Sequence, residues 1–70
     1  MTVKEFGSRL KNIRKSRNIS RETMANAIGI TSPSYTNYEN GFRLPNVLKL
    51  PIISSMLGVS VDYLLGISNE

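Results

Sequence analysis

Apolar residues in the first part of the chain recur at intervals of three and four, the spacing that lines one face of an α-helix. The positions are Val3, Phe6, Leu10 and Ile13. Thr2 and Glu5 form a capping box, in which each side chain satisfies a free backbone N–H of the first helical turn. The pattern predicts a first helix over residues 3–17, ending at Asn18, which tolerates the left-handed conformation found just past helix ends.

A second, shorter helix is predicted to follow Ser20, whose hydroxyl can cap it. Met24, Ala25 and Ile28 share its inward face. The small side chain of Ala25 suits a close helix crossing, and Gly29 accepts the positive φ of a sharp reversal.

A third helix is predicted to begin with Thr31 or Ser32 as its cap, and Pro33 is tolerated in its first turn. Tyr35 and Tyr38, three residues apart, face inward. The remaining side chains of this helix then lie toward solvent: Ser32, Pro33, Ser34, Thr36 and Asn37.

Asn46 is a plausible cap for a fourth helix that reaches Leu57 before Gly58. Pro51 interrupts it, so we expect either a kink or a helix that becomes regular only around Leu50.

Ser60 caps a short last helix through Leu65, and Gly66 ends it. We expect one compact all-α, five-helix domain over residues 1–66 and a frayed tail over residues 67–70.

The fourth helix carries more apolar residues than one packed face needs. Four of them can serve the core: Val47, Leu50, Ile53 and Leu57. Leu48, Ile52 and Met56 remain as a second apolar stripe. Such a stripe indicates either a homodimer interface or a helix that the last helix and the tail cover on its second side.

Composition narrows the chemistry. The chain lacks cysteine and histidine, which excludes disulfides, the usual zinc sites and histidine-based catalysis, so no metal, cofactor or enzymatic activity is expected. No apolar run approaches the roughly 18 residues of a membrane span, and no export leader is evident, so we expect a cytoplasmic protein without membrane contact.

The net charge is +4, and six of the nine Lys and Arg residues fall within the first seventeen positions. This asymmetry suits a polyanionic partner, although a solvated helix face would look the same.

Residues 20–41 have the layout of a helix-turn-helix, whose second helix enters the DNA major groove. From Phe6 to Leu65 the chain resembles the DNA-binding domain of phage Cro and repressor proteins, the XRE family, which has a lambda-repressor-like fold. The residues that carry this resemblance are Leu10-x-x-x-Arg14, Ser20 to Ala25, Gly29-Ile30-Thr31, Tyr38-Glu39-Asn40-Gly41, Pro45 and Leu57-Gly58-Val59-Ser60.

The resemblance implies a role for several residues. Arg14 would pair with Glu39 and orient the recognition helix. Ser32, Pro33, Thr36 and Asn37 would face base edges, and the Asn37 amide can pair with adenine N6 and N7. Phosphate contacts would come from the following residues: Arg21, Ser34, Asn40, Arg43, Arg17 and Lys11. Arg21 stands where the family usually has glutamine, which leaves open whether it braces the third helix.

We therefore expect a transcriptional regulator that binds double-stranded DNA, a repressor acting as a homodimer on a near-palindromic operator. The rival interpretation is a protein-interaction module whose main surface is the stripe of Leu48, Ile52 and Met56; its protein partner would be unknown.

Overall fold

The computed structural model describes residues 1–69 as a bundle of short helices. In chain order these are α1 (Val3–Ser16), α2 (Arg21–Ile28), α3 (Ser32–Glu39), a 3-10 turn η1 (Val47–Lys49), α4 (Leu50–Leu57) and α5 (Val61–Leu64). No strand occurs within these residues. The expected all-α architecture is confirmed.

Local capping explains where most helices begin. Thr2 and Glu5 form both bonds of the capping box, at 3.0 and 2.9 Å. Ser20 accepts the N–H of Thr23 at 3.0 Å. For α3 the cap is Thr31, whose hydroxyl accepts the N–H of Ser34 at 3.2 Å, so the side chain of Ser32 is left out of the cap.

Past the helix ends the chain turns through left-handed residues. Asn18 has φ +57° after α1, and Gly29 has φ +83° after α2. Both were predicted to adopt this conformation.

Of the two predicted effects of Pro51, a kink or a late start of the regular helix, the structure shows the late start. Asn46 caps the 3-10 turn through a bond from the Leu48 N–H at 3.0 Å, and the regular helix starts only at Leu50. This places Pro51 in the first turn of α4, where its missing N–H costs little.

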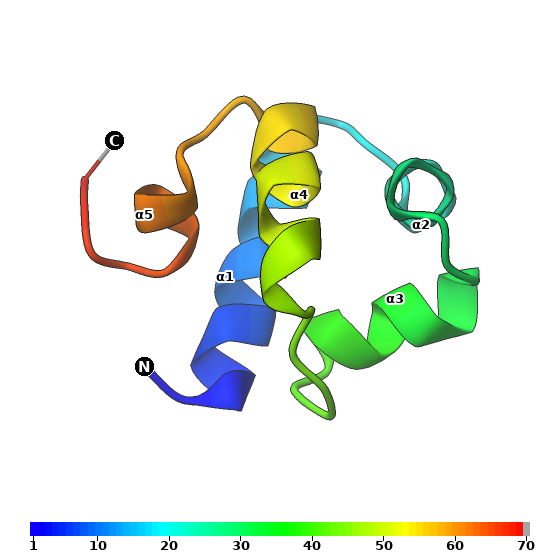
Figure 1. Ribbon diagram of the computed structural model, residues 1–70, viewed down its shortest axis with the longest axis horizontal. Coiled ribbons are helices and arrows are strands. Elements are labelled where there is room, and N and C mark those ends of the chain that lie inside the picture. The colour runs from blue at the N-terminus through cyan, green and yellow to red at the C-terminus, as the bar shows by residue number, and fades with distance from the viewer. Residues whose placement is uncertain (70) are drawn as a thin grey trace.

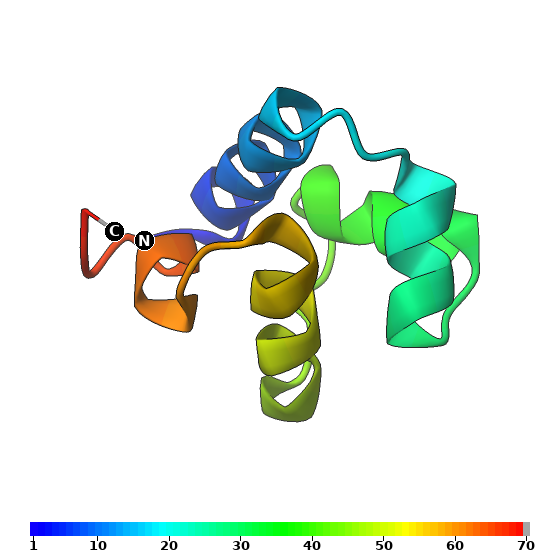
Figure 2. The same cartoon turned by 90° about the horizontal axis from the view of Figure 1, so that it is seen from above.

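The helices surround one core (Figure 1), in which α1 packs against α3 and α5 while α2 packs against α3 and α4. Seen from above, α4 stands between α5 on one side and the α2–α3 pair on the other (Figure 2). The buried apolar side chains are Phe6, Leu10, Ile13, Met24, Ala25, Ile28, Tyr35, Tyr38, Ile53, Leu57 and Leu64.

Two expectations for the fourth helical segment need correction. Val47 was expected in the core but is 73% exposed, because it lies in the 3-10 turn, where three residues per turn shift the helical register. Met56 was expected on the outer stripe but is half-buried against the core. Leu48 is 79% exposed and Ile52 39%, so α5 and the tail do not cover them.

The expected fraying of residues 67–70 stays a prediction, and the first residues of this tail are hydrogen-bonded to α5. The N–H of Ile67 donates to the carbonyl of Asp62 at 2.9 Å, which turns the chain back over α5. The last residue, Glu70, lies outside the described residues. None of the helices within residues 1–69 has the length and hydropathy of a membrane span.

Candidate nucleic-acid interface

The turn between α2 and α3 is held by backbone and side-chain hydrogen bonds. The N–H groups of Gly29 and Ile30 both donate to the carbonyl of Ala25, at 2.9 and 3.0 Å. The Lys49 ammonium donates to the carbonyl of Ile28 at 3.1 Å and so caps the end of α2 from η1. These bonds close the C-terminal end of α2 and tie it to η1.

The outer face of α3 has no charged side chain. Pro33 and Ser34 are exposed, and Ser32, Thr36 and Asn37 are half-buried. The Thr36 hydroxyl donates to the carbonyl of Ser32 at 2.9 Å, which leaves its methyl group and an oxygen lone pair for a ligand. The Asn37 side chain makes no hydrogen bond with residues 1–69, so its amide can both donate and accept.

A buried ionic network ties α3 to the two preceding helices. Glu39, whose side chain is fully buried, accepts from Arg14 at 2.6 and 3.2 Å and from Arg21 at 3.1 Å. Arg14 also donates to the carbonyl of Ile19 at 2.8 Å. The pairing of Arg14 with Glu39 and the bracing of α3 by Arg21 are therefore both present in the structure.

Within this network Arg14 and Glu39 are both held in their ionised forms. Burial acts to raise the pKa of Glu39, but hydrogen bonds from Arg14 and Arg21 outweigh it and hold that pKa below its ordinary value. The hydrogen bond to Glu39 raises the pKa of Arg14. Tyr35 points its hydroxyl into the same region without a hydrogen-bond partner, and burial and the Glu39 carboxylate raise the pKa of Tyr35.

A close approach of α1 to the end of α3, which the sequence pattern did not reveal, fixes where α3 lies against α1. A Cβ atom on Gly7 would lie 2.5 Å from the carbonyl oxygens of both Tyr38 and Glu39. The only sequence signal was a glycine in the middle of a strong helical pattern, where glycine is unfavourable without a packing reason.

The nine cations divide into two groups. Five donate hydrogen bonds within the fold: Arg9 to Tyr63, Arg14 to Glu39 and Ile19, Arg17 to Leu57, Arg21 to Glu39 and Lys49 to Ile28. Four make no hydrogen bond or ion pair with residues 1–69: Lys4, Lys11, Lys15 and Arg43. Of the predicted phosphate contacts, Lys11 and Arg43 are uncommitted, whereas Arg17 and Arg21 are partly engaged by the protein.

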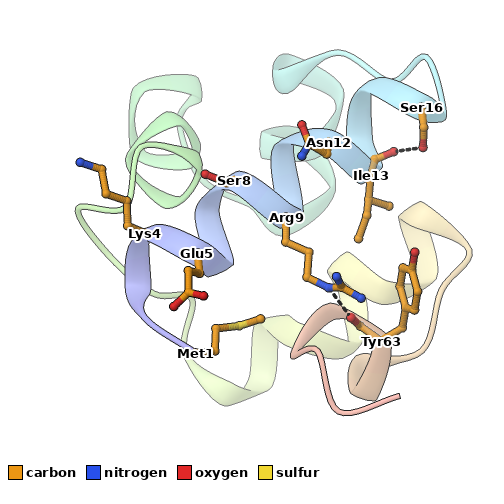
Figure 3. A pocket seen from close by; sticks show the side chains of 9 residues that line it. All are labelled: Met1, Lys4, Glu5, Ser8, Arg9, Asn12, Ile13, Ser16 and Tyr63. Atoms are coloured by element: carbon orange, nitrogen blue, oxygen red, sulfur yellow. Dashed lines mark hydrogen bonds between the residues drawn. The ribbon is translucent and has the colours of Figure 1, made fainter. Parts of the chain in front are cut away.

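A polar groove lies between α1 and α5 and contains no residue of α2 or α3 (Figure 3). Arg9 closes one side of it, donating to the Tyr63 carbonyl at 2.7 Å with its guanidinium 4.4 Å from the Tyr63 ring centre. Within residues 1–69 no cluster of acidic side chains is arranged to hold a metal ion.

Comparison with known proteins places this geometry among helix-turn-helix proteins. The helix-turn-helix family model matches residues 10–64. The uncharacterized HTH-type transcriptional regulator YqaE of Bacillus subtilis (strain 168) is 48% identical over 66 residues, covering 93% of this chain and 57% of YqaE. The cryptic phage CTXphi transcriptional repressor RstR of Vibrio cholerae is 42% identical over 66 residues, covering 94% of this chain and 56% of RstR. The chain thus spans a little more than half the length of these relatives.

Solved structures have the same fold. The restriction-modification controller protein C.AhdI from Aeromonas hydrophila superposes with a TM-score of 0.80 at 24% identity, over 89% of this chain and 90% of that one. ComR from Streptococcus suis gives a TM-score of 0.83 at 27% identity, over 100% of this chain and 23% of ComR.

Proposed function

This chain belongs to the helix-turn-helix family of Cro-like and repressor-like proteins, the XRE family, and we propose that it represses transcription by binding a near-palindromic DNA operator as a homodimer. The family assignment also agrees with the expectation that the chain is not an enzyme.

The observation that carries the DNA-binding proposal is the way α3 is held. Its inner side is anchored by the buried pair of Arg14 and Glu39, while its outer side carries small uncharged side chains, of which Asn37 makes no side-chain hydrogen bond with residues 1–69. Such a helix fits the major groove, where hydrogen bonds and methyl contacts to base edges discriminate sequence. We assign base reading to Ser32, Pro33, Thr36 and Asn37, with Asn37 contacting adenine.

Because this reading face has no charge, affinity must come from phosphate contacts around it. Arg43 is the best candidate for a phosphate contact, since it is exposed and makes no hydrogen bond or ion pair with residues 1–69. Asn40 and Ser34 are exposed at the two ends of α3, and Lys11 is uncommitted on α1. Arg21 is 41% exposed, so part of its guanidinium remains free to meet a phosphate while it braces Glu39. Arg17 is the weakest of the set, because its Nε is bound to the Leu57 carbonyl.

Homodimerisation is supported by the exposed apolar surface of η1 and α4. Val47 and Leu48 are among the most exposed apolar residues of the structure, and Ile52 extends the surface by one turn. No residue of α4 is charged, and the Lys49 ammonium is directed at Ile28, so two copies can meet there without charge repulsion. A two-fold dimer presents two reading helices about 34 Å apart, one turn of the duplex.

Repression is supported by RstR, a relative of higher identity that is named a transcriptional repressor. Repression by occupying a promoter requires DNA binding alone, so the proposed function involves no cofactor. The proposed location of the protein is the cytoplasm.

Selection of bound duplexes from a random pool tests the proposal. We expect a near-palindrome with half-sites about one helical turn apart. Enrichment of a single half-site would contradict the dimer. Failure to enrich any sequence, with a flat salt profile on random duplex, would contradict DNA binding and favour the protein-interaction module.

A further inference from the structure

The first turn of α1 touches the segment that follows α3. Gly41 has φ +78°, and its α-carbon is so close to α1 that a Cβ there would lie 2.8 Å from the α-carbon of Lys4. The same Cβ would lie 3.2 Å from both the Cβ and the Cγ of Lys4. The stem of the Lys4 side chain therefore starts directly beside Gly41.

The segment on which Lys4 rests is fixed to the recognition helix. The N–H of Gly41 donates to the Tyr38 carbonyl at 3.3 Å, and the N–H groups of Phe42 and Arg43 donate to the Asn37 carbonyl at 2.9 and 3.3 Å. Any movement of α3 thus carries these residues with it. Lys4 consequently has a defined position relative to Asn40 and Arg43, the residues proposed to contact phosphate at this end of α3.

Lys4 is exposed and has no competing partner among residues 1–69. The carboxylate of the adjacent Glu5 is engaged in the capping box, accepting from the Thr2 N–H at 2.9 Å. Lys4 and Arg9 both line the α1–α5 groove (Figure 3), but Arg9 turns toward Tyr63 and donates to its carbonyl, whereas the Lys4 side chain makes no hydrogen bond with the residues drawn. Of the two cations in this part of α1, one is used by the fold and the other is free.

We infer that Lys4 is a phosphate-binding residue that joins Arg43 in gripping the DNA backbone beside Gly41. The inference rests on the proposed DNA-binding function. A lysine suits the position because its ammonium is a point charge on a flexible stem and needs no fixed bonding geometry. The extra contact supplies positive charge next to a reading helix that has none.

The test is a salt titration of binding to a random-sequence duplex, comparing the wild type with Lys4→Gln. We expect the slope of log K against log salt to become shallower by about 0.9, the contribution of one phosphate contact. Between 50 and 200 mM salt, the wild type then loses about threefold more affinity than the variant. Lys4→Arg restores the wild-type slope.

Lys15→Gln is the matched control, since it removes the same charge from an uncommitted residue at the other end of α1. It is expected to leave the slope unchanged. A wild type that shows no saturable duplex binding would overturn the proposed function itself. A wild type that binds with a steep slope, shared by Lys4→Gln, would overturn only the role of Lys4. Equal slope changes in Lys4→Gln and Lys15→Gln would also overturn the role of Lys4, because they would show a general effect of removing positive charge.

Discussion

Arg14 and Glu39 are 25 residues apart in the chain, yet they share two hydrogen bonds, from Nε to Oε2 at 2.6 Å and from Nη2 to Oε1 at 3.2 Å. Their side chains are 9% and 0% exposed. The net contribution of such a pair to stability is modest, because its Coulombic attraction is offset by the loss of hydration of both groups. Its specific effect is to set where the last turn of α3 lies on α1.

Replacing Glu39 by Gln is expected to lower the free energy of unfolding by about 3–5 kcal/mol, because the buried Arg14 guanidinium loses its counter-charge. Urea unfolding followed by circular dichroism measures this. The control is Arg21→Gln, which removes the more exposed partner and should cost at most about 1 kcal/mol. Equal losses in the two variants would contradict the central position of the Arg14–Glu39 pair.

Acid should destabilise the protein through the same carboxylate. The pKa of Glu39 is below its ordinary value of 4.5 in the folded state, so its contribution is fully present above that value. It is lost as the pH falls through the folded pKa. Thermal unfolding between pH 7 and pH 2 should show a falling melting temperature in the wild type and a flatter curve in Glu39→Gln. If the melting temperatures of the wild type and Glu39→Gln fell in parallel, other carboxylates would be responsible for the loss of stability in acid.

For Gly7→Ala, the packing of α1 against α3 predicts a loss of stability, whereas helix propensity alone predicts a gain. In a free helix this change stabilises by about 0.5–1 kcal/mol. In this structure the new Cβ would meet the Tyr38 and Glu39 carbonyl oxygens at 2.5 Å, and the forced separation should destabilise by about 1–3 kcal/mol. Ser8→Ala, at the exposed neighbouring position, should be neutral or slightly stabilising. A stabilised Gly7→Ala variant would disprove the close approach of α1 to α3.

Asn37→Ala should cost about 1–3 kcal/mol of binding free energy on the selected operator and relax the preference at one base pair. Arg43→Ala, in contrast, should weaken binding to all duplexes alike and lower the salt slope by about one contact. Fluorescence anisotropy with matched and mismatched operators separates the two effects. An equal loss for Asn37→Ala on every sequence would assign that residue to positioning only.

Leu48→Glu should dissociate the proposed dimer without unfolding the monomer, because Leu48 is 79% exposed and surface changes usually alter stability by no more than about 0.5 kcal/mol. Sedimentation equilibrium measures the association directly. Ile67→Glu is the control, since Ile67 is similarly exposed at 72% but lies in the tail beyond α5. A Leu48→Glu variant that sediments like the wild type would place the interface elsewhere.

Helix positions were largely predictable because their signals are local. Ser20 and Asn46 cap the segments that follow them through bonds spanning two or three residues, and Gly29 ends α2 through its own backbone conformation. The effect of Pro51 was narrowed to two outcomes, one of which the structure adopts. Val47 was misplaced because a 3-10 turn changes the angular step between side chains, which a periodicity of 3.6 does not anticipate.

The candidate site was predictable only where a resemblance supplied long-range information. The pairing of Arg14 with Glu39 came from that resemblance, and so did the base-reading role proposed for the outer face of α3. The spacing of Tyr35 and Tyr38 alone predicted which side of that helix faces solvent. The contact of Gly7 with α3 and the bond of Lys49 to Ile28 join segments distant in sequence. Neither leaves a periodic trace, so both required the folded structure.

The cap of α3 has an evolutionary consequence. Because Thr31 performs the capping and the tyrosines supply the buried contacts, Ser32, Pro33 and Asn37 are spared from stabilising the interior. After gene duplication, substitutions at these positions can accumulate with little penalty to folding. Under the proposed base-reading role of these residues, two descendants of one ancestor can thus come to prefer different operators while their scaffolds stay interchangeable.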